Sequence, residues 1–215
     1  MTVETKICGI NDATAMRTVV AAGASFVGLV FYPPSPRAVG PEEAAELAAL
    51  VPDGVTKVGL FVDPDDDLID TVLAAAPLDM LQLHGSETPE RCAGLREHTK
   101  LPVMKAIKVA DAGDIETAKD YLGSVDWLMF DAKAPDTMKG ALPGGNALSF
   151  DWTLLSGRTW PVPWMLAGGI NPDNVVSAVR ASGASVVDVS SGVESEPGRK
   201  DSAKIEAFLD AVKNL

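Results

Sequence analysis

Residues 56–83 read TKVGLFVDPDDDLIDTVLAAAPLDMLQL and contain two short apolar segments with an Ala/Leu-rich segment between them. The runs at 56–62 and 79–83 are of strand length and rich in Val, Leu and Phe, which is typical of buried β-strands. The run at 66–76 has the length and pattern of an amphipathic helix. Because parallel strands need such a crossover, this unit predicts an α/β fold with a parallel sheet.

The same unit recurs along the whole chain, in eight rounds. Eight rounds predict a closed sheet, so we expect a single (β/α)8 barrel, a TIM barrel, as one catalytic domain over 1–215. An open, doubly wound sheet is the alternative. The predicted strands are 3–8, 25–31, 56–62, 79–83, 102–107, 126–131, 163–167 and 185–190, and the predicted helices are 12–22, 41–51, 66–76, 89–98, 112–122, a short piece near Trp152, 172–181 and 202–214.

Residues that favour helix ends support these boundaries. Polar or proline residues stand at the predicted starts, and glycines that can adopt a left-handed conformation follow two predicted helices. The start residues are Asn11 or Asp12, Pro41, Pro89 and the run Asn171-Pro172-Asp173, and the glycines are Gly23 and Gly183.

Composition narrows the class of partner. The chain has 215 residues and a formal net charge of −12, which disfavours binding to nucleic acid or to an anionic membrane. No segment approaches the ~20 apolar residues of a membrane helix, and residues 1–10 lack the pattern of a secretory leader. Cys8 and Cys92 are far apart and lack metal-ligand spacing, so we expect no disulfide framework or zinc site. A cytoplasmic protein with a small-molecule partner is expected.

One long irregular segment interrupts the repeat. Residues 132–149, AKAPDTMKGALPGGNALS, follow the sixth strand and are rich in Gly and Pro. Long loops in compact domains are commonly functional, so a mobile lid over a site is one interpretation. An inert surface insertion is the other.

The carboxyl ends of the strands are where a barrel carries its active site. The seventh strand ends at Gly168-Gly169 and the eighth at Ser190-Ser191-Gly192. Small residues let backbone N–H groups approach an anion closely, and phosphate sites recur after strands seven and eight of this fold. We therefore expect a phosphate site there, although ordinary tight turns would have the same composition.

Two further strand ends carry groups that can move protons. Cys8 closes the first strand, and Lys6 shares its face of that strand. A nearby ammonium group favours the thiolate, which would make Cys8 a base, although a buried structural cysteine is the common alternative. Asp131 closes the sixth strand, and as a helix cap or a partner of Lys133 it would have no catalytic role. An acid and a base facing one small substrate could together move its protons.

Three other polar residues fall near the same end. Arg37 lies in the proline-stiffened loop YPPSPRAV, which would hold a guanidinium for a carboxylate or a phosphate. His84 closes the fourth strand and is assigned no acid-base role, because a hydrogen-bonded structural histidine explains it equally well. Asp188 lies in the eighth strand, next to the first strand in a closed barrel, so a buried pair with Lys6 is expected.

Taken together, these residues resemble the phosphoribosylanthranilate isomerases of tryptophan biosynthesis. The resemblance runs along essentially the whole chain. Its motifs are KICGI at 6–10, GLVFYPPSPRAV at 28–39, VGLFVD at 58–63, LQLHG at 81–85, DAK at 131–133, FDW at 150–152, LAGGINPDNV at 166–175 and DVSSGVE at 188–194.

The resemblance implies an eightfold barrel that needs no metal or organic cofactor and catalyses an Amadori rearrangement of a phosphosugar. It places the family's general base on Cys8, its general acid on Asp131, and the contact to the substrate carboxylate on Arg37. The family's phosphate-binding positions fall on Gly168, Gly169, Ser191 and Gly192. Oligomeric state varies in the family, so a monomer or a homodimer is expected.

This chain departs from the family pattern at one place, where PGG is followed by Asn146-Ala147 in place of Thr-Gly or Asn-Gly. If that position needs a positive φ, alanine costs about 1 kcal/mol.

Three other functions fit parts of the pattern. A non-catalytic phosphometabolite-binding barrel would keep the anion site but has no need of Cys8 and Asp131. A Schiff-base aldolase would use a lysine at 105, 108 or 133. A related aminoaldose isomerase of histidine synthesis uses paired aspartates, whereas the first strand here ends in cysteine.

Overall fold

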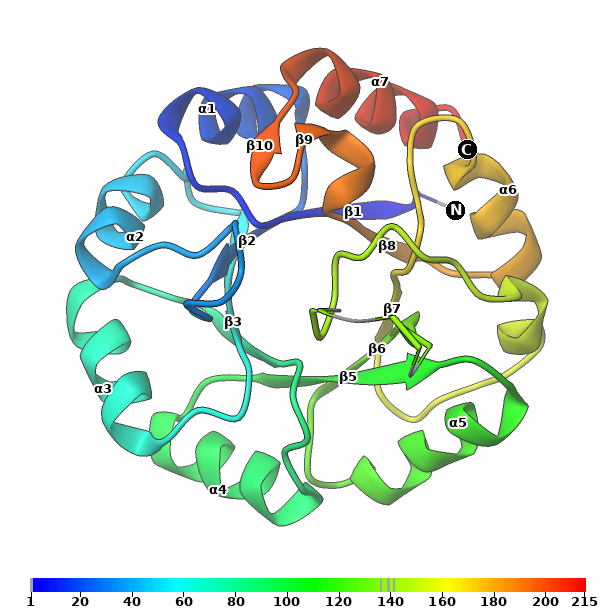
Figure 1. The fold of residues 1–215 in the computed structure, drawn as a ribbon, viewed down its shortest axis with the longest axis horizontal. Helices are drawn as coiled ribbons and strands as arrows, with labels where there is room; N and C mark the ends of the chain where they lie inside the picture. Colours follow the sequence, from blue (N-terminus) through cyan, green and yellow to red (C-terminus); the bar gives the residue numbers. More distant parts are fainter. Residues whose placement is uncertain (1, 136, 139, 141) are drawn as a thin grey trace.

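The computed structural model describes residues 2–135, 137–138, 140 and 142–215. The described residues form a closed barrel of eight parallel strands in sequence order, and β1 pairs with β8 to close the ring (Figure 1). The predicted barrel is confirmed, and the open sheet is excluded. The strands are β1 (Glu4–Cys8), β2 (Phe26–Val30), β3 (Thr56–Phe61), β4 (Met80–Leu83), β5 (Val103–Val109), β6 (Trp127–Ala132), β7 (Trp164–Leu166) and β8 (Val186–Val189).

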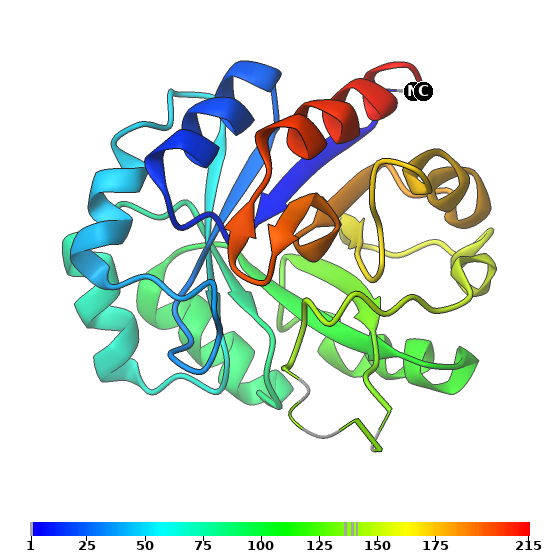
Figure 2. The same cartoon turned by 45° about the horizontal axis from the view of Figure 1, so that its top comes forward.

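Helices surround the barrel, as Figures 1 and 2 show. The α-helices are α1 (Ala13–Ala22), α2 (Pro41–Ala48), α3 (Asp66–Ala75), α4 (Pro89–Thr99), α5 (Ala112–Glu116), α6 (Val175–Ser182) and α7 (Ser202–Lys213). Short 3-10 helices are η1 (Thr117–Tyr121), η2 (Trp152–Leu155) and η3 (Ser191–Val193). The helix predicted over 112–122 is thus α-helical only in its first half.

Local chemistry explains where the helices begin and end. The Asp12 carboxylate accepts the Ala15 N–H at 2.9 Å, which caps α1, and Gly23 ends that helix with φ +86°. The helix predicted from 172 begins at Val175 instead. The cause is the Asn171 side chain, which accepts the N–H groups of Asp173 and Asn174 and forms a turn there.

Two hydrophobic layers follow from the alternation of side chains along the strands. In β5, Met104 and Ala106 point into the barrel, where they pack with residues such as Val58 and Met165. Val103 and Ile107 point outward, into the larger core beneath the helices. The interior of the barrel is therefore packed with side chains.

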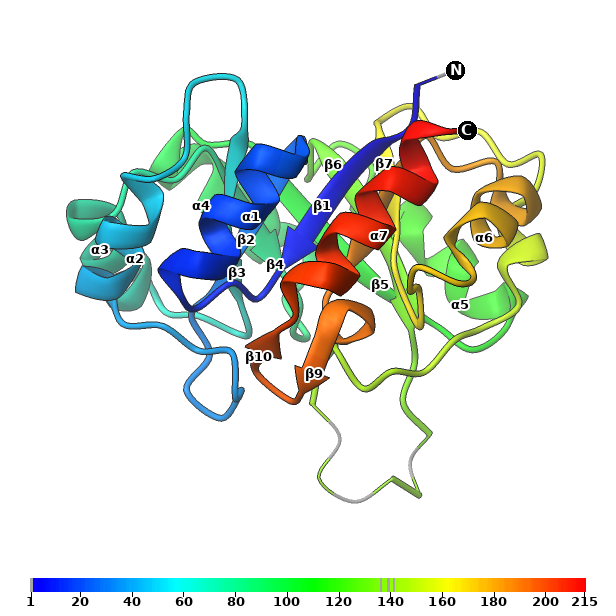
Figure 3. The ribbon, with the colours of Figure 1, turned by 90° about the horizontal axis from the view of Figure 1, so that it is seen from above.

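The carboxyl ends of the strands lie on the side of the molecule away from the two chain termini (Figure 3). The same side carries the described residues of the segment 132–149 and an antiparallel hairpin of β9 (Glu194–Glu196) and β10 (Arg199–Lys200). The sequence analysis did not predict this hairpin. No helix in the described part of the chain is long and apolar enough to span a bilayer.

Candidate active site

A cavity of about 760 Å³, counted with its open mouth, lies at the carboxyl end of the barrel. Cys8 from β1, Asp131 from β6 and Arg37 from the loop after β2 all line it. The turns after β7 and β8 contribute Gly168, Gly169, Ser190 and Ser191. Residues that are far apart in sequence therefore meet at one hollow because their strands end there.

Cys8 lies deep in this hollow, with only 4% of its surface exposed. Burial raises the pKa of its thiol, while the ammonium groups of Lys6 and Lys200 act to lower it and Asp188 acts to raise it. The sequence-based expectation that Lys6 would favour the thiolate is thus right in sign. It is wrong in outcome, because loss of solvent outweighs the nearby charges and keeps the pKa above its ordinary value.

Lys6 is fully buried, and its Nζ lies 2.7 Å from Asp188 Oδ1, so the predicted ion pair is confirmed. Burial alone would lower the pKa of Lys6, but Asp188 and Cys8 together raise it. A Cβ on Gly28 of β2 would lie 2.9 Å from Cys8 Sγ and 3.2 Å from Lys6 Nζ. The glycine therefore leaves the space in which the thiol and the ammonium meet.

Asp131 contacts the imidazole of His84, with 3.1 Å between Oδ2 and Nε2. Its other carboxylate oxygen accepts the N–H of Ala132 at 2.8 Å. Lys133 pairs with Asp114 at 2.8 Å, so the interpretation of Asp131 as its partner is wrong. Both Asp131 and His84 line the cavity, and one oxygen of the carboxyl faces the ring of His84.

Arg37 is 5% exposed and is held by a carboxylate of the protein itself. Its Nε and Nη2 donate to the two oxygens of Glu194 at 2.7 and 2.8 Å, and Nη2 also contacts the Gly145 carbonyl at 3.3 Å. Lys200 Nζ shares Glu194 at 2.7 Å. Arg37 and Lys200 hold the pKa of Glu194 below its usual range against the effect of burial. Two cations and one anion leave the cluster one positive charge in excess, which favours an anion in the cavity.

The two turns expected to bind phosphate both reach the cavity. Gly168 and Gly169 have φ of +86° and +67°, which favours glycine, and Ser191 begins η3 beside them. Gly192 packs behind the cavity wall: a Cβ there would lie 2.0 Å from the Ile170 carbonyl oxygen. Its position supports close packing of the two turns.

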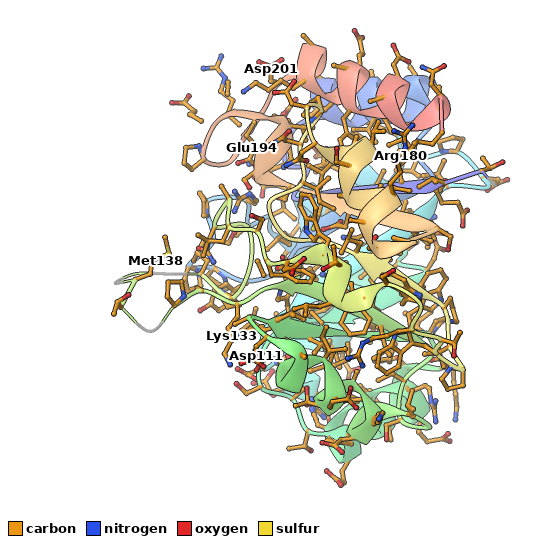
Figure 4. All side chains as sticks on the ribbon, turned by 90° about the vertical axis from the view of Figure 1, so that its right-hand side faces the viewer. Asp111, Lys133, Met138, Arg180, Glu194 and Asp201 are labelled. Atoms are coloured by element: carbon orange, nitrogen blue, oxygen red, sulfur yellow. The ribbon has the colours of Figure 1, made fainter. Side chains whose placement is uncertain are left out.

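The end of the segment 132–149 covers part of the cavity, which residues from Leu142 to Leu148 line. Asn146 forms paired hydrogen bonds with the backbone of Leu142, at 3.0 and 2.7 Å. Ala147 has φ +57°, so this position does require the positive φ that the sequence comparison raised. Met138 stands out from the barrel on the outer part of the segment (Figure 4). Asp136, Lys139 and Ala141 lie outside the described residues, and movement of the segment as a lid stays a prediction.

None of the three lysines considered for a Schiff base lines this cavity. Lys105 points outward from β5 and forms a buried pair with Glu87 at 2.7 Å, and Lys108 lines a separate hollow near Tyr121. None of these three described lysines is therefore placed to form a Schiff base with a substrate in the cavity. Over the described ranges, no cluster of three or more His, Cys, Asp or Glu side chains could hold a metal ion.

Sequence reasoning missed three residues that contact the predicted ones: Glu194, Lys200 and Gln82. Glu194 ends the DVSSGVE motif and Gln82 lies in LQLHG. The sequence analysis quoted both motifs but gave neither residue a role. Figure 4 shows Glu194 near the start of the hairpin, beside the chain that leads to Asp201. Lys200 contacts Glu194 and Ser190, which are 6 and 10 positions away in sequence, but its strand of two residues is too short to show a hydrophobic period.

Comparison with known proteins supports one family. The family model described as "N-(5'phosphoribosyl)anthranilate (PRA) isomerase" matches residues 5–211. A protein of that name from Paramagnetospirillum magneticum is 61% identical over 214 residues, covering 99% of this chain and 98% of the relative. Another from Rhodospirillum centenum is 60% identical over 209 residues and covers 97% of both chains.

Solved structures agree with this match. The phosphoribosyl anthranilate isomerase of Thermotoga maritima superimposes with a TM-score of 0.88 at 37% identity, covering 99% of this chain and 100% of that one. A phosphoribosyl anthranilate isomerase in complex with reduced 1-(o-carboxyphenylamino)-1-deoxyribulose 5-phosphate gives 0.84 at 35% identity, with coverage of 99% and 100%. The chain therefore belongs to the N-(5'-phosphoribosyl)anthranilate isomerase family.

Proposed function

We propose that this chain converts N-(5'-phosphoribosyl)anthranilate into 1-(2-carboxyphenylamino)-1-deoxyribulose 5-phosphate, a step of tryptophan biosynthesis. The observation that carries the proposal is that Cys8 and Asp131 line one cavity together with Arg37 and the two small-residue turns. An acid, a base and two anion-binding places within one hollow match a substrate that has a carboxylate at one end and a phosphate at the other.

Asp131 acts as the general acid in this proposal. Its carboxyl proton passes to the ring oxygen of the furanose, the bond from that oxygen to C1′ breaks, and the bonding electrons stay on the oxygen. The lone pair of the anthranilate nitrogen forms the C1′=N bond of an open-chain Schiff base. Asp131 lines the cavity, so its carboxyl group can reach a substrate bound there.

Cys8 then acts as the general base. Its thiolate removes the proton from C2′, and the electrons of that C–H bond form a C1′=C2′ double bond while the C=N electrons return to nitrogen. The resulting enolamine becomes the ketone when C1′ gains a proton and the hydroxyl on C2′ loses one. One proton is given and one is taken, so the isomerisation needs no oxidant or reductant.

The two charged ends of the substrate are assigned to two different sets of residues. Arg37 binds the anthranilate carboxylate, which the excess positive charge of its cluster favours. The phosphate is assigned to the backbone N–H groups of Gly168, Gly169 and Ser191, with Gly192 supporting the turn from behind. Two fixed ends would orient C1′ and C2′ between Asp131 and Cys8.

Fluorescence of freshly made phosphoribosylanthranilate, followed as it is consumed, tests the proposal. We expect turnover by the wild-type chain, and a loss of about 10²- to 10⁴-fold in kcat for Cys8→Ala and for Asp131→Asn. Cys92→Ala is the matched control, because Cys92 is also buried but lies on α4, away from the cavity. Equal turnover by Cys8→Ala and wild type, with both chains folded by circular dichroism, would exclude the role of Cys8.

The remaining expectations belong to the same proposal. We infer that residues 1–215 act as one catalytic domain in the cytoplasm, which the free thiols of Cys8 and Cys92 support. A monomer or a homodimer is expected. A structure of the Thermotoga maritima enzyme is described as monomers generated from a dimeric phosphoribosylanthranilate isomerase. Gel filtration with light scattering decides between the two states for this chain.

A further inference from the structure

Three buried side chains, Asp131, His84 and Gln82, form a row along the wall of the cavity. His84 lies between them: its Nε2 is 3.1 Å from Asp131 Oδ2, and its Nδ1 is 3.0 Å from Gln82 Nε2. Gln82 and His84 are both on β4, and their exposed fractions are 0% and 4%. The side chain of Gln82 therefore determines whether Nδ1 of His84 donates or accepts a hydrogen bond.

The amide nitrogen of Gln82, and not its oxygen, faces the histidine. That nitrogen also lies 3.3 Å from Met129 Sδ, and a thioether accepts hydrogen bonds but cannot donate them. The two N–H groups of the amide thus serve Met129 and His84. With the amide turned over, Oε1 would lie against the Met129 thioether, which has no hydrogen to donate, whereas in the orientation present Oε1 is a buried atom without a partner among the described residues. The contact with Met129 therefore favours the orientation in which the amide nitrogen faces His84.

This orientation fixes the proton on His84. Nδ1 must accept from Gln82, so the ring proton is on Nε2, where it is donated to Asp131. A second proton, on Nδ1, would bring the N–H of His84 and the N–H of Gln82 into repulsive contact. We propose that Gln82 holds His84 as the neutral Nε2–H tautomer and so leaves Asp131 able to carry the proton that it gives to the substrate. The inference rests on the proposed acid role of Asp131.

A charged imidazolium in the same place would act in the opposite way. It would hold Asp131 as a carboxylate through an ion pair, and a carboxylate has no proton to give. The neutral ring supplies one hydrogen bond to Oδ2, and the Ala132 N–H supplies another to Oδ1. These two bonds orient the carboxyl group and still leave a lone pair on each oxygen for a proton. Gln82 and His84 are thus positioning residues that act through Asp131.

Nitrogen NMR of the folded chain tests the tautomer without any need for activity. The chain has two histidines, and His98→Gln removes the other one, which is on the exposed end of α4. In ¹⁵N-histidine-labelled His98→Gln protein at neutral pH, we expect His84 to show a protonated Nε2 and an unprotonated Nδ1. A protonated Nδ1 would overturn the proposal.

Substitutions at Gln82 test the consequence for the reaction. In Gln82→Glu the new carboxylate accepts a hydrogen bond from Nδ1–H, which favours the charged imidazolium, so both ring nitrogens of His84 should be protonated. We expect kcat to fall at least about tenfold, with KM within about twofold of wild type, because Arg37 and the phosphate turns are untouched. Gln82→Met, which keeps the volume and cannot donate, should lower kcat by less and serves if Gln82→Glu does not fold.

Two substitutions at His84 test whether a neutral hydrogen-bond donor to Asp131 is enough for activity. His84→Gln offers Asp131 a neutral N–H donor that cannot become charged, and we expect it to keep at least about tenfold more activity than His84→Leu. Unchanged kcat in the folded Gln82 variants would overturn this inference while leaving the proposed function standing. Absence of turnover by wild type would remove the proposed function, and the tautomer measurement would still decide whether Gln82 sets the proton on His84.

Discussion

Cys8 shows how burial and nearby charge oppose each other at one residue. Loss of solvent raises the pKa of the thiol, and the ammonium groups of Lys6 and Lys200 offset only part of that rise. A thiol with a raised pKa is mostly protonated at neutral pH, so the reactive thiolate increases as the pH rises toward that pKa.

We therefore expect two rates to increase with pH above neutrality: kcat, and the alkylation of Cys8 by iodoacetamide. Both are to be measured in a Cys92→Ala background, since burial raises the pKa of Cys92 to about 11 and its thiol would react at high pH. Lys200→Met should slow alkylation at any given pH, because it removes a cation that lowers the pKa of Cys8. Lys213→Met, on the exposed end of α7, is the control. A rate that falls with pH would contradict the assignment of the thiolate.

Ala147 is a second residue whose backbone carries a local cost. Its φ of +57° lies in the left-handed region, where a Cβ meets the following carbonyl oxygen. We expect Ala147→Gly to raise the free energy of unfolding by up to about 1 kcal/mol, as measured by urea denaturation. Ala38→Gly, in the loop after β2 and without a positive φ, should not stabilise the chain. A loss of stability in Ala147→Gly would show that the strain at this position is negligible.

At the scale of elements, the β9–β10 hairpin holds the arginine loop in place. Glu194 opens the hairpin and accepts from Arg37, while Lys200 closes it and contacts the same carboxylate. Gly198 packs against the backbone of Pro36, since a Cβ there would lie 2.4 Å from its carbonyl oxygen. The hairpin therefore connects β8 to the loop after β2 and holds that loop in position.

We expect Glu194→Gln to raise KM for phosphoribosylanthranilate by about tenfold, with a smaller change in kcat, because Arg37 loses its charged partner but Cys8 and Asp131 do not. Glu196→Gln, on the same hairpin, removes an exposed pair with Arg199 and should change neither value. In an Arg37→Ala background, Glu194→Gln should add little, since both changes act on one interaction. Fully additive effects on KM would show that Glu194 acts by another route.

At the scale of the whole molecule, the Lys6–Asp188 pair joins the first and last strands of the barrel. The two residues are partners in the β1–β8 register and are 182 positions apart in sequence. Because the pair is almost fully buried, loss of one member leaves an uncompensated charge inside the protein.

We expect Lys6→Met to lower the free energy of unfolding by about 3–5 kcal/mol, measured by urea denaturation. Lys57→Met breaks the more exposed pair with Asp79 and should cost no more than about 1 kcal/mol. The double variant Lys6→Met, Asp188→Leu should regain much of the lost stability, because no buried charge is left alone. Equal losses for Lys6→Met and Lys57→Met would mean that burial does not strengthen the pair.

The fold could be predicted well because it depends on local patterns. All eight predicted strands are present, and Gly23 and Gly183 end their helices in the left-handed conformation, as expected. The hairpin was missed because its strands are only three and two residues long, too short for a hydrophobic period. The start of α6 was misplaced because the Asn171 side chain competes for the first N–H groups.

The sequence by itself determined the strand–helix repeat and the polar residues at the strand ends. Each of these depends on neighbours along the chain. Only the tertiary structure decided that Glu194 holds Arg37 across 157 positions, that His84 contacts Asp131 across 47 positions, and that the pKa of Cys8 is raised. Burial and long-range partners come into existence only when the barrel closes, so no local pattern carries them.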